Sequence, residues 1–176
     1  MGAYRKKVQI AILILVVLIG GFAIGNALFK NDSKVPGVGD SPPGFSLFDL
    51  NGNAHNLSDY EGKPLIITFW GTFCPPCVKE LPEFQRLYDK WQSKGLEVLA
   101  INLSEADLPV QNFVSKLNLN FTVLRDVNRK VERQYGLRSY PTTFFVKPDG
   151  TISEIAITAM TEKQIQERVE KLFQSS

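Results

Sequence analysis

Two cysteines, Cys74 and Cys77, are the only thiols of the chain, and both lie in the stretch "FWGTFCPPCVKELP". A pair of thiols two residues apart can open and close a small disulfide ring. One thiolate attacks a foreign disulfide and forms a mixed disulfide, and the second thiol then releases the product. The expected chemistry is thiol–disulfide exchange, with Cys74 as the nucleophile and Cys77 as the resolving thiol.

The predicted elements around this pair suit that chemistry. Residues 64–70, "PLIITFW", are an apolar run typical of a central strand buried on both faces, and a helix is expected over about residues 75–93. Cys74 would then precede a helix N-terminus, whose free N–H groups and partial positive charge stabilise a thiolate. Pro75 and Pro76 would stiffen the ring without losing a helical hydrogen bond.

Other uses of a cysteine pair remain as alternatives. A zinc site needs four ligands, and a copper carrier needs a well-placed histidine, yet His55 is the sole histidine and lies in a predicted hairpin. A purely structural disulfide that closes two intervening residues removes little chain entropy, so it would stabilise the fold weakly.

The rest of the domain alternates between strands and helices. A hairpin is expected around Asn51-Gly52, and a second hairpin over residues 142–158 around Pro148-Asp149-Gly150. The other expected strands are 96–103 and 121–126, and the other expected helices are 108–117, 128–136 and 161–173. This order predicts an α/β fold with a mainly parallel central sheet, helices on both faces and an antiparallel edge, and therefore a mixed sheet.

The N-terminal part has a different composition. Residues 1–7 are a basic segment, and residues 8–29 carry no charge. About 22 helical residues span about 33 Å, enough to cross a bilayer core. The basic residues would keep the N-terminus cytoplasmic. We therefore expect a single-pass transmembrane anchor in a bacterial cell membrane, with a cleaved signal peptide as the alternative. A Pro/Gly/Ser-rich linker, residues 30–40, would lead to an extracytoplasmic domain, residues 41–176.

The net charge gives no reason to expect a nucleic-acid partner. The chain has 20 basic and 18 acidic residues, a net charge of +2. Without Arg5, Lys6 and Lys7, the balance is 17 basic against 18 acidic residues, a net charge of −1.

The stretches "FWGTFCPPCVKELPEF" and "YPTTFFVKPDG" together resemble the TlpA/ResA-like group of membrane-anchored thiol–disulfide oxidoreductases, in the thioredoxin superfamily. The similarity extends over about residues 41–173. It implies a thioredoxin-like fold with an added N-terminal β-hairpin and an inserted helical segment at about residues 104–120. It also implies that Cys74 is the exposed nucleophile.

The resemblance implies a substrate-binding surface around the cysteines. Pro141 matches the cis-proline of the family, and the backbone of Tyr140 would pair with an extended substrate segment. Phe73 replaces the tryptophan that usually precedes the first cysteine, and would remain an apolar platform. Together with Pro75 and Pro76, these residues are the expected substrate-binding set.

Glu80 is the third expected catalytic residue. It lies three positions after Cys77 on the same helix, where a carboxylate can raise a thiol pKa and exchange a proton. General thioredoxins carry a buried aspartate on the preceding strand. Thr68 occupies that position here, which favours Glu80 for proton handling.

The resemblance finally implies a function and partners. We expect a reductant of disulfides in exported proteins, most of all the CxxCH cysteines of apocytochrome c, fed by a membrane thiol donor of the CcdA/DsbD type. No cofactor is expected beyond the redox-active pair. The alternatives are a disulfide oxidase or isomerase, a reductant for sporulation or oxidase-assembly proteins, a peroxidase, and a tethered non-catalytic binding module.

Overall fold

The computed structural model describes residues 5, 9, 12–21 and 35–174. The chain divides into two compact units, Met1–Lys34 and Val35–Ser176. In the first unit, residues 12–21 are helical. The predicted anchor over residues 8–29 lies partly outside the described residues, as does most of the basic segment 1–7. Among the residues that are described, no helix combines the length and the apolar character that a membrane span requires.

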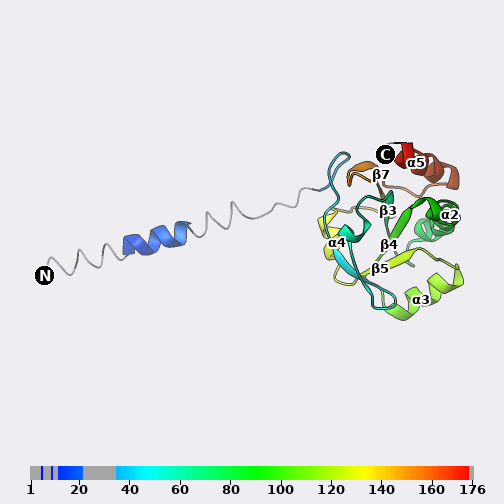
Figure 1. Cartoon of the computed structure of the whole chain (residues 1–176). Helices are drawn as coiled ribbons and strands as arrows, with labels where there is room; N and C mark the ends of the chain where they lie inside the picture. Colours follow the sequence, from blue (N-terminus) through cyan, green and yellow to red (C-terminus); the bar gives the residue numbers. More distant parts are fainter. Residues whose placement is uncertain (1–4, 6–8, 10–11, 22–34, 175–176) are drawn as a thin grey trace. The chain divides into compact units, whose positions relative to one another are not determined.

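The second unit is built on one seven-stranded sheet with the strand order β2-β1-β5-β4-β3-β6-β7 (Figure 1). The strands are β1 Ser46–Asp49, β2 Ala54–Asn56, β3 Leu65–Trp70, β4 Glu97–Leu103, β5 Thr122–Asp126, β6 Thr142–Val146 and β7 Ile152–Ala156.

The pairing of these strands makes the sheet mixed, as predicted. Only β3, β4 and β5 are parallel to one another. The β1–β2 hairpin pairs antiparallel with β5, and the β6–β7 hairpin pairs antiparallel with β3. The expectation of a mainly parallel sheet was therefore wrong, because a hairpin extends the parallel strands on each side rather than on one.

Four helices lie close to their predicted positions: α2 Pro75–Trp91, α3 Asp107–Lys116, α4 Lys130–Gln134 and α5 Glu162–Gln174. The predicted start of α5 is supported by reciprocal bonds between Thr161 and Gln164, since each backbone N–H donates to the side chain of the other residue. Two 3-10 turns, η1 Leu57–Tyr60 and η2 Gln92–Lys94, complete the set. The sequence analysis did not predict η1.

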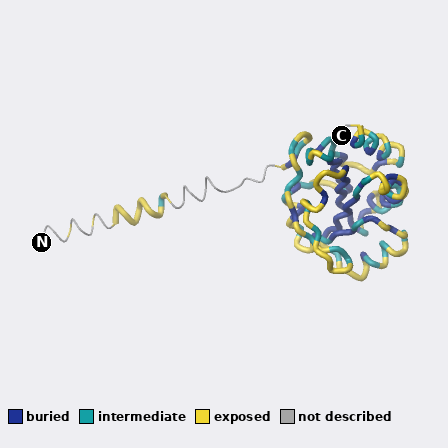
Figure 2. The backbone as a smooth tube through the Cα atoms, in the orientation of Figure 1, coloured by how far each residue is buried: buried dark blue, intermediate teal, exposed yellow. Residues whose placement is uncertain are grey.

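The sheet separates two apolar clusters of buried residues. The buried stretches of the chain lie in the centre of the second unit (Figure 2). Successive residues of β3 alternate between them. Ile66 and Trp70 pack with α2 and α5, whereas Ile67 and Phe69 pack on the other face with side chains from η1 and α4. All six residues of β3 are buried, as a central strand requires.

Residues just before the first strand are attached to the sheet. The N–H of Gly39 donates to the carbonyl of Ile152 at 2.8 Å, and the N–H of Ile152 donates to the carbonyl of Asp40 at 2.9 Å. These bonds attach residues 39–40 to the start of β7, within the second compact unit, Val35–Ser176.

Candidate active site

The cysteine pair lies where β3 passes into α2. Cys74 is the N-cap of α2, with Pro75 and Pro76 in the first helical turn. The two cysteines form a disulfide whose Cα atoms are 5.3 Å apart. The N–H of Cys77 donates to the Cys74 sulfur at 3.3 Å. One of the free N–H groups of the helix start thus points at the sulfur that would carry negative charge after reduction.

The two sulfurs differ little in exposure. Cys74 is 7% exposed and Cys77 is 1% exposed, and both belong to the apolar cluster under α2. Cys74 was expected to be exposed. In this oxidised form it is buried, although it is more exposed than Cys77. By contrast, Phe73 is 54% exposed, and Pro75 and Pro76 are also at the surface. An apolar surface therefore surrounds a largely covered disulfide.

The loop before Cys74 places Gly71 close to the Phe73 ring. The N–H of Cys74 donates to the carbonyl of Gly71 at 3.1 Å, which closes a turn. A Cβ atom at Gly71 would lie 2.3 Å from Cε1 of Phe73. Because carbon atoms cannot approach that closely, a side chain at Gly71 would displace the Phe73 ring.

The predicted cis-proline is present at the neighbouring strand. The Tyr140–Pro141 peptide bond is cis. β6 begins at the next residue, Thr142, whose register partner on β3 is Phe69. Since β3 ends one residue after Phe69, the cis peptide bond and the cysteine loop lie at the same end of the sheet. Pro141 is buried and Tyr140 is partly buried.

Glu80 is placed inside the protein, as its proposed role requires. It is 2% exposed, and its Oε1 accepts a hydrogen bond from the Met160 N–H at 2.8 Å. Burial raises the pKa of this carboxyl group to about 7, although the Met160 bond favours the charged form. Glu80 also lines a small pocket with Pro76, the residue that precedes Cys77. Thr68 is buried on β3, and its hydroxyl shares a hydrogen bond with the Thr143 hydroxyl at 2.9 Å.

Glu105 is a site residue that the sequence analysis missed. One of its carboxylate oxygens accepts bonds from the Thr72 N–H and from Asn102 Nδ2, each at 2.7 Å, and the other accepts from the Thr72 hydroxyl. The guanidinium of Arg125 donates to the Glu105 carbonyl at 2.7 Å. Glu105 thus ties the cysteine loop to the ends of β4 and β5. Its place just after a predicted strand was the available signal, because the carboxyl ends of parallel strands meet at one edge of the sheet.

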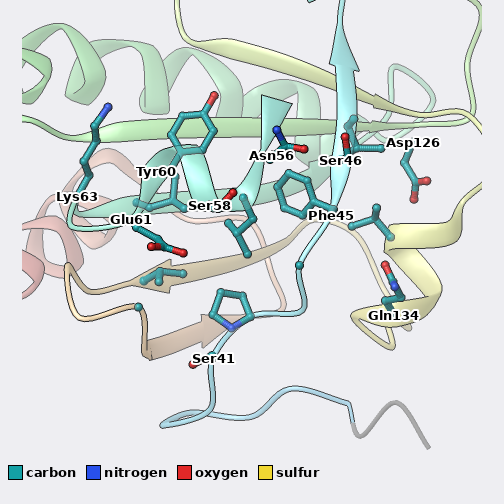
Figure 3. Close-up of a pocket in the computed structure, with 18 of the residues that line it drawn as sticks. Ser41, Phe45, Ser46, Asn56, Ser58, Tyr60, Glu61, Lys63, Asp126 and Gln134 are labelled. Atoms are coloured by element: carbon teal, nitrogen blue, oxygen red, sulfur yellow. The ribbon is translucent and has the colours of Figure 1, made fainter. Parts of the chain in front are cut away.

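A larger pocket lies away from these residues. It has a volume of about 1150 Å³ and is lined by the N-terminal hairpin, the loop after β5 and the β6–β7 turn. Figure 3 shows Phe45, Tyr60 and Lys63 among its lining side chains. Neither cysteine lines it, so cavity size alone would have pointed to the wrong region. Among the described residues, no group of three His, Cys, Asp or Glu side chains is placed to hold a metal ion.

Comparison with known proteins agrees with this geometry. Residues 38–155 match the AhpC/TSA family. The thiol–disulfide oxidoreductase ResA of Bacillus thuringiensis strain Al Hakam is 34% identical over 170 residues, which cover 96% of this chain and 98% of the relative. ResA of Bacillus subtilis strain 168 is 35% identical over 161 residues, which cover 92% of this chain and 89% of the relative.

A solved structure supports the same assignment. A Chlorobium tepidum protein described as a thiol:disulfide interchange protein DsbE superposes with a TM-score of 0.73 at 25% identity, covering 78% of this chain and 98% of that one. Fold, disulfide and relatives together define a thiol–disulfide oxidoreductase with a thioredoxin-like fold. The chain belongs to the AhpC/TSA family, and within it to the ResA-type thiol–disulfide oxidoreductases.

Proposed function

We propose that this protein reduces disulfides in exported proteins on the extracytoplasmic side of a bacterial membrane, and that its main substrate is the CxxCH pair of apocytochrome c. The observation that carries the proposal is the Cys74–Cys77 disulfide at the start of α2, at the same sheet end as a cis-proline. Kinship with ResA proteins supports thiol–disulfide exchange. The resemblance to the anchored TlpA/ResA-like group supports the location and the substrate.

The proposed reaction begins with the reduced pair. The Cys74 thiolate attacks one sulfur of the substrate disulfide, so the substrate S–S bond breaks and a mixed disulfide forms. The first substrate sulfur leaves as a thiolate and takes up a proton. Cys77, once deprotonated, attacks the Cys74 sulfur, re-forms the internal disulfide and releases the second substrate thiol. Two electrons and two protons pass to the substrate, and the cysteine pair needs no further cofactor to carry them.

Two other groups have roles in this proposal. Glu80, with a carboxyl pKa of about 7, takes the proton of Cys77 before the second attack and returns one when the pair is reduced again. The backbone of Tyr140 pairs with an extended substrate segment, while Phe73, Pro75 and Pro76 contact its side chains.

Re-reduction requires a source of electrons outside the cytoplasm. We propose a membrane dithiol donor of the CcdA/DsbD type, which attacks the Cys74–Cys77 disulfide and becomes oxidised itself. The apolar segment at residues 8–29 would hold the domain next to that donor as a single-pass anchor. This arrangement leaves residues 41–176 facing the substrates.

The reduction potential of the Cys74–Cys77 pair tests the proposed direction. We expect about −270 mV or lower in thiol redox buffers, as in thioredoxin. A value between about −120 and −180 mV would instead identify an oxidase or isomerase.

Trapping tests the substrate. The Cys77→Ser variant should accumulate a mixed disulfide between Cys74 and a peptide that contains an oxidised CxxCH pair, visible by mass spectrometry. The Cys74→Ser variant is the control and should form none. If oxidised sporulation or oxidase-assembly proteins are trapped faster than the cytochrome peptide, the choice of substrate is wrong, although the chemistry stands.

A further inference from the structure

Tyr140 is held by a residue from a distant part of the fold. Its ring packs against both apolar clusters, and its phenol O–H donates to Oε1 of Glu132 on α4. Burial, together with the Glu132 bond, raises the pKa of the phenol to about 12, so the phenol keeps the proton that it donates. The side chain before the cis-proline is therefore fixed at its outer end as well as by packing.

The burial of the Glu132 carboxylate at this position lowers the stability of the fold. It is 9% exposed, and its Oε2 accepts no hydrogen bond from any described residue. The nearest cation to that oxygen is Arg129, with its Nε 3.5 Å away. A buried carboxylate with an unsatisfied oxygen destabilises a protein unless another interaction compensates. Within the described residues, the phenol of Tyr140 is the one side chain that donates a hydrogen bond to the Glu132 carboxylate, so holding Tyr140 is the evident use of this carboxylate.

The helix that carries Glu132 is firmly placed. Both carboxylate oxygens of Asp126, at the end of β5, accept backbone N–H bonds at 2.8 Å, one from Lys130 and one from Glu132 itself. Arg129, just before the helix, has the left-handed backbone conformation, with φ at 51°. A non-glycine residue adopts that conformation only where its surroundings impose it. The backbone that carries the Glu132 side chain is thus fixed relative to the sheet.

The backbone of Tyr140, which the phenol holds in place, has polar groups available for pairing. The β3–β6 ladder begins at Thr142, and the N–H and C=O groups of Tyr140 take part in none of the turn and loop backbone bonds of residues 35–174. The hydroxyl of Thr142 closes the segment by donating to the Ser139 carbonyl at 2.7 Å. A short segment is therefore fixed at both ends while the polar groups of its middle residue stay available.

We propose that Glu132 is a positioning residue that selects polypeptide substrates by holding the Tyr140 phenol, and through it the backbone that an extended substrate pairs with. This inference rests on the proposed function. Glu132 acts through Tyr140 rather than by contact with the reacting sulfurs. Small disulfides need no pairing with the Tyr140 backbone, so the effect should be confined to peptides.

The test compares two disulfides in single-turnover reactions of the reduced full chain, where KM denotes the half-saturating disulfide concentration and kcat the limiting rate of reduction. One is a peptide with an internal CxxC disulfide, and the other is 5,5′-dithiobis(2-nitrobenzoate). Glu132→Ala removes the acceptor of the Tyr140 phenol, and we expect its KM for the peptide to rise about tenfold, the value of one hydrogen bond to a charged group. Its kcat, and its rate with the small disulfide, should stay at the wild-type values. Tyr140→Phe keeps the ring but removes the same bond, and it should raise the peptide KM by the same factor. Glu132→Gln should recover most of the affinity, and the double variant should be no worse than either single variant.

Tyr135→Phe is the matched control. It removes another phenol bond near α4, from the Tyr135 O–H to the Pro43 carbonyl at 3.0 Å, without touching the cis-proline segment. Its KM for the peptide should stay at the wild-type value. The inference is overturned if Tyr140→Phe leaves the peptide KM unchanged, if both disulfides slow equally, or if the two changes add. Wild-type protein that reduces neither disulfide would overturn the proposed function itself, and this inference with it.

Discussion

Glu80 combines two properties that rarely coincide in a stable protein. It is almost fully buried, and its carboxyl pKa of about 7 lies close to neutral pH. A carboxyl group with such a pKa accepts and releases protons readily near pH 7. The same burial penalises the charged form, so the residue useful for proton transfer should also cost stability.

That cost should depend on pH in a predictable way. The pKa of Glu80 rises from 4.5 in the unfolded chain to about 7 in the fold, so the folded state binds the proton more tightly. As the pH rises from about 4.5 to 8, the free energy of unfolding of the wild type should therefore fall relative to that of Glu80→Gln. The relative loss should be about 3 kcal/mol by the linkage relation. Urea denaturation of both proteins across this range measures it.

A flat difference in unfolding free energy between the wild type and Glu80→Gln over this pH range would show that Glu80 does not titrate as described.

At the residue scale, local pattern was enough for part of the site. Cys74, Cys77 and Pro141 stand in short stretches whose chemistry is readable in sequence. Glu105 and Glu132 were not found, because each acts through a partner from another element. Thr72 and Glu105 are 33 positions apart, and only the parallel β3–β4 pairing brings their strand ends together. Acidic residues in such positions look like ordinary surface residues until the sheet is assembled.

At the scale of elements, the cysteine loop is fixed by the ends of its neighbours. Glu105 follows β4, and its carboxylate accepts hydrogen bonds from the N–H and the hydroxyl of Thr72. The guanidinium of Arg125 on β5 donates to the Glu105 carbonyl. A loop that would otherwise be mobile is thereby attached to two parallel strands. This arrangement keeps the reacting sulfur in one place relative to the sheet.

Glu105→Ala should therefore loosen the loop without unfolding the domain. The variant leaves the Thr72 N–H and the Asn102 amide without their acceptor, so we expect a loss of about 1–3 kcal/mol in unfolding free energy. Hydrogen exchange at the Thr72 amide should accelerate more than exchange in the centre of β4. Glu170→Ala, which removes a carboxylate on α5 that accepts from Gln166, is the control and should leave the Thr72 amide unchanged. Equal protection of Thr72 in all three proteins would contradict the role of Glu105.

The elements themselves were mostly predictable, and the exceptions have physical causes. The long helices and buried strands were found from apolar spacing, apolar runs and capping residues. The η1 turn was missed because four residues cannot show a helical period. It is defined instead by Asp59, whose carboxylate accepts the Asn56 N–H at 2.7 Å. The two-sided antiparallel extension was missed because apolar alternation reports burial but not which strand lies alongside.

At the scale of the molecule, the domain should be self-sufficient. Both apolar clusters consist of residues from the second unit, which starts at Val35. A fragment of residues 35–176 should therefore fold cooperatively, with the same melting temperature for this domain as the full chain in matched detergent buffer. Calorimetry measures both. A fragment that melts more than about 4 °C lower, equivalent to roughly 1 kcal/mol, would show that earlier residues stabilise the domain.

Both cysteines are buried in the apolar cluster under α2. The reduction potential of the pair is therefore linked to the stability of the fold. Cys74 and Cys77 share their cluster with Trp70, Leu81 and Phe84. Oxidation and unfolding then form one thermodynamic cycle, so a substitution that favours the oxidised fold over the reduced fold by about 1.4 kcal/mol lowers the reduction potential by about 30 mV. Core residues that never meet a substrate can thereby set which partners donate electrons to this protein and which accept them.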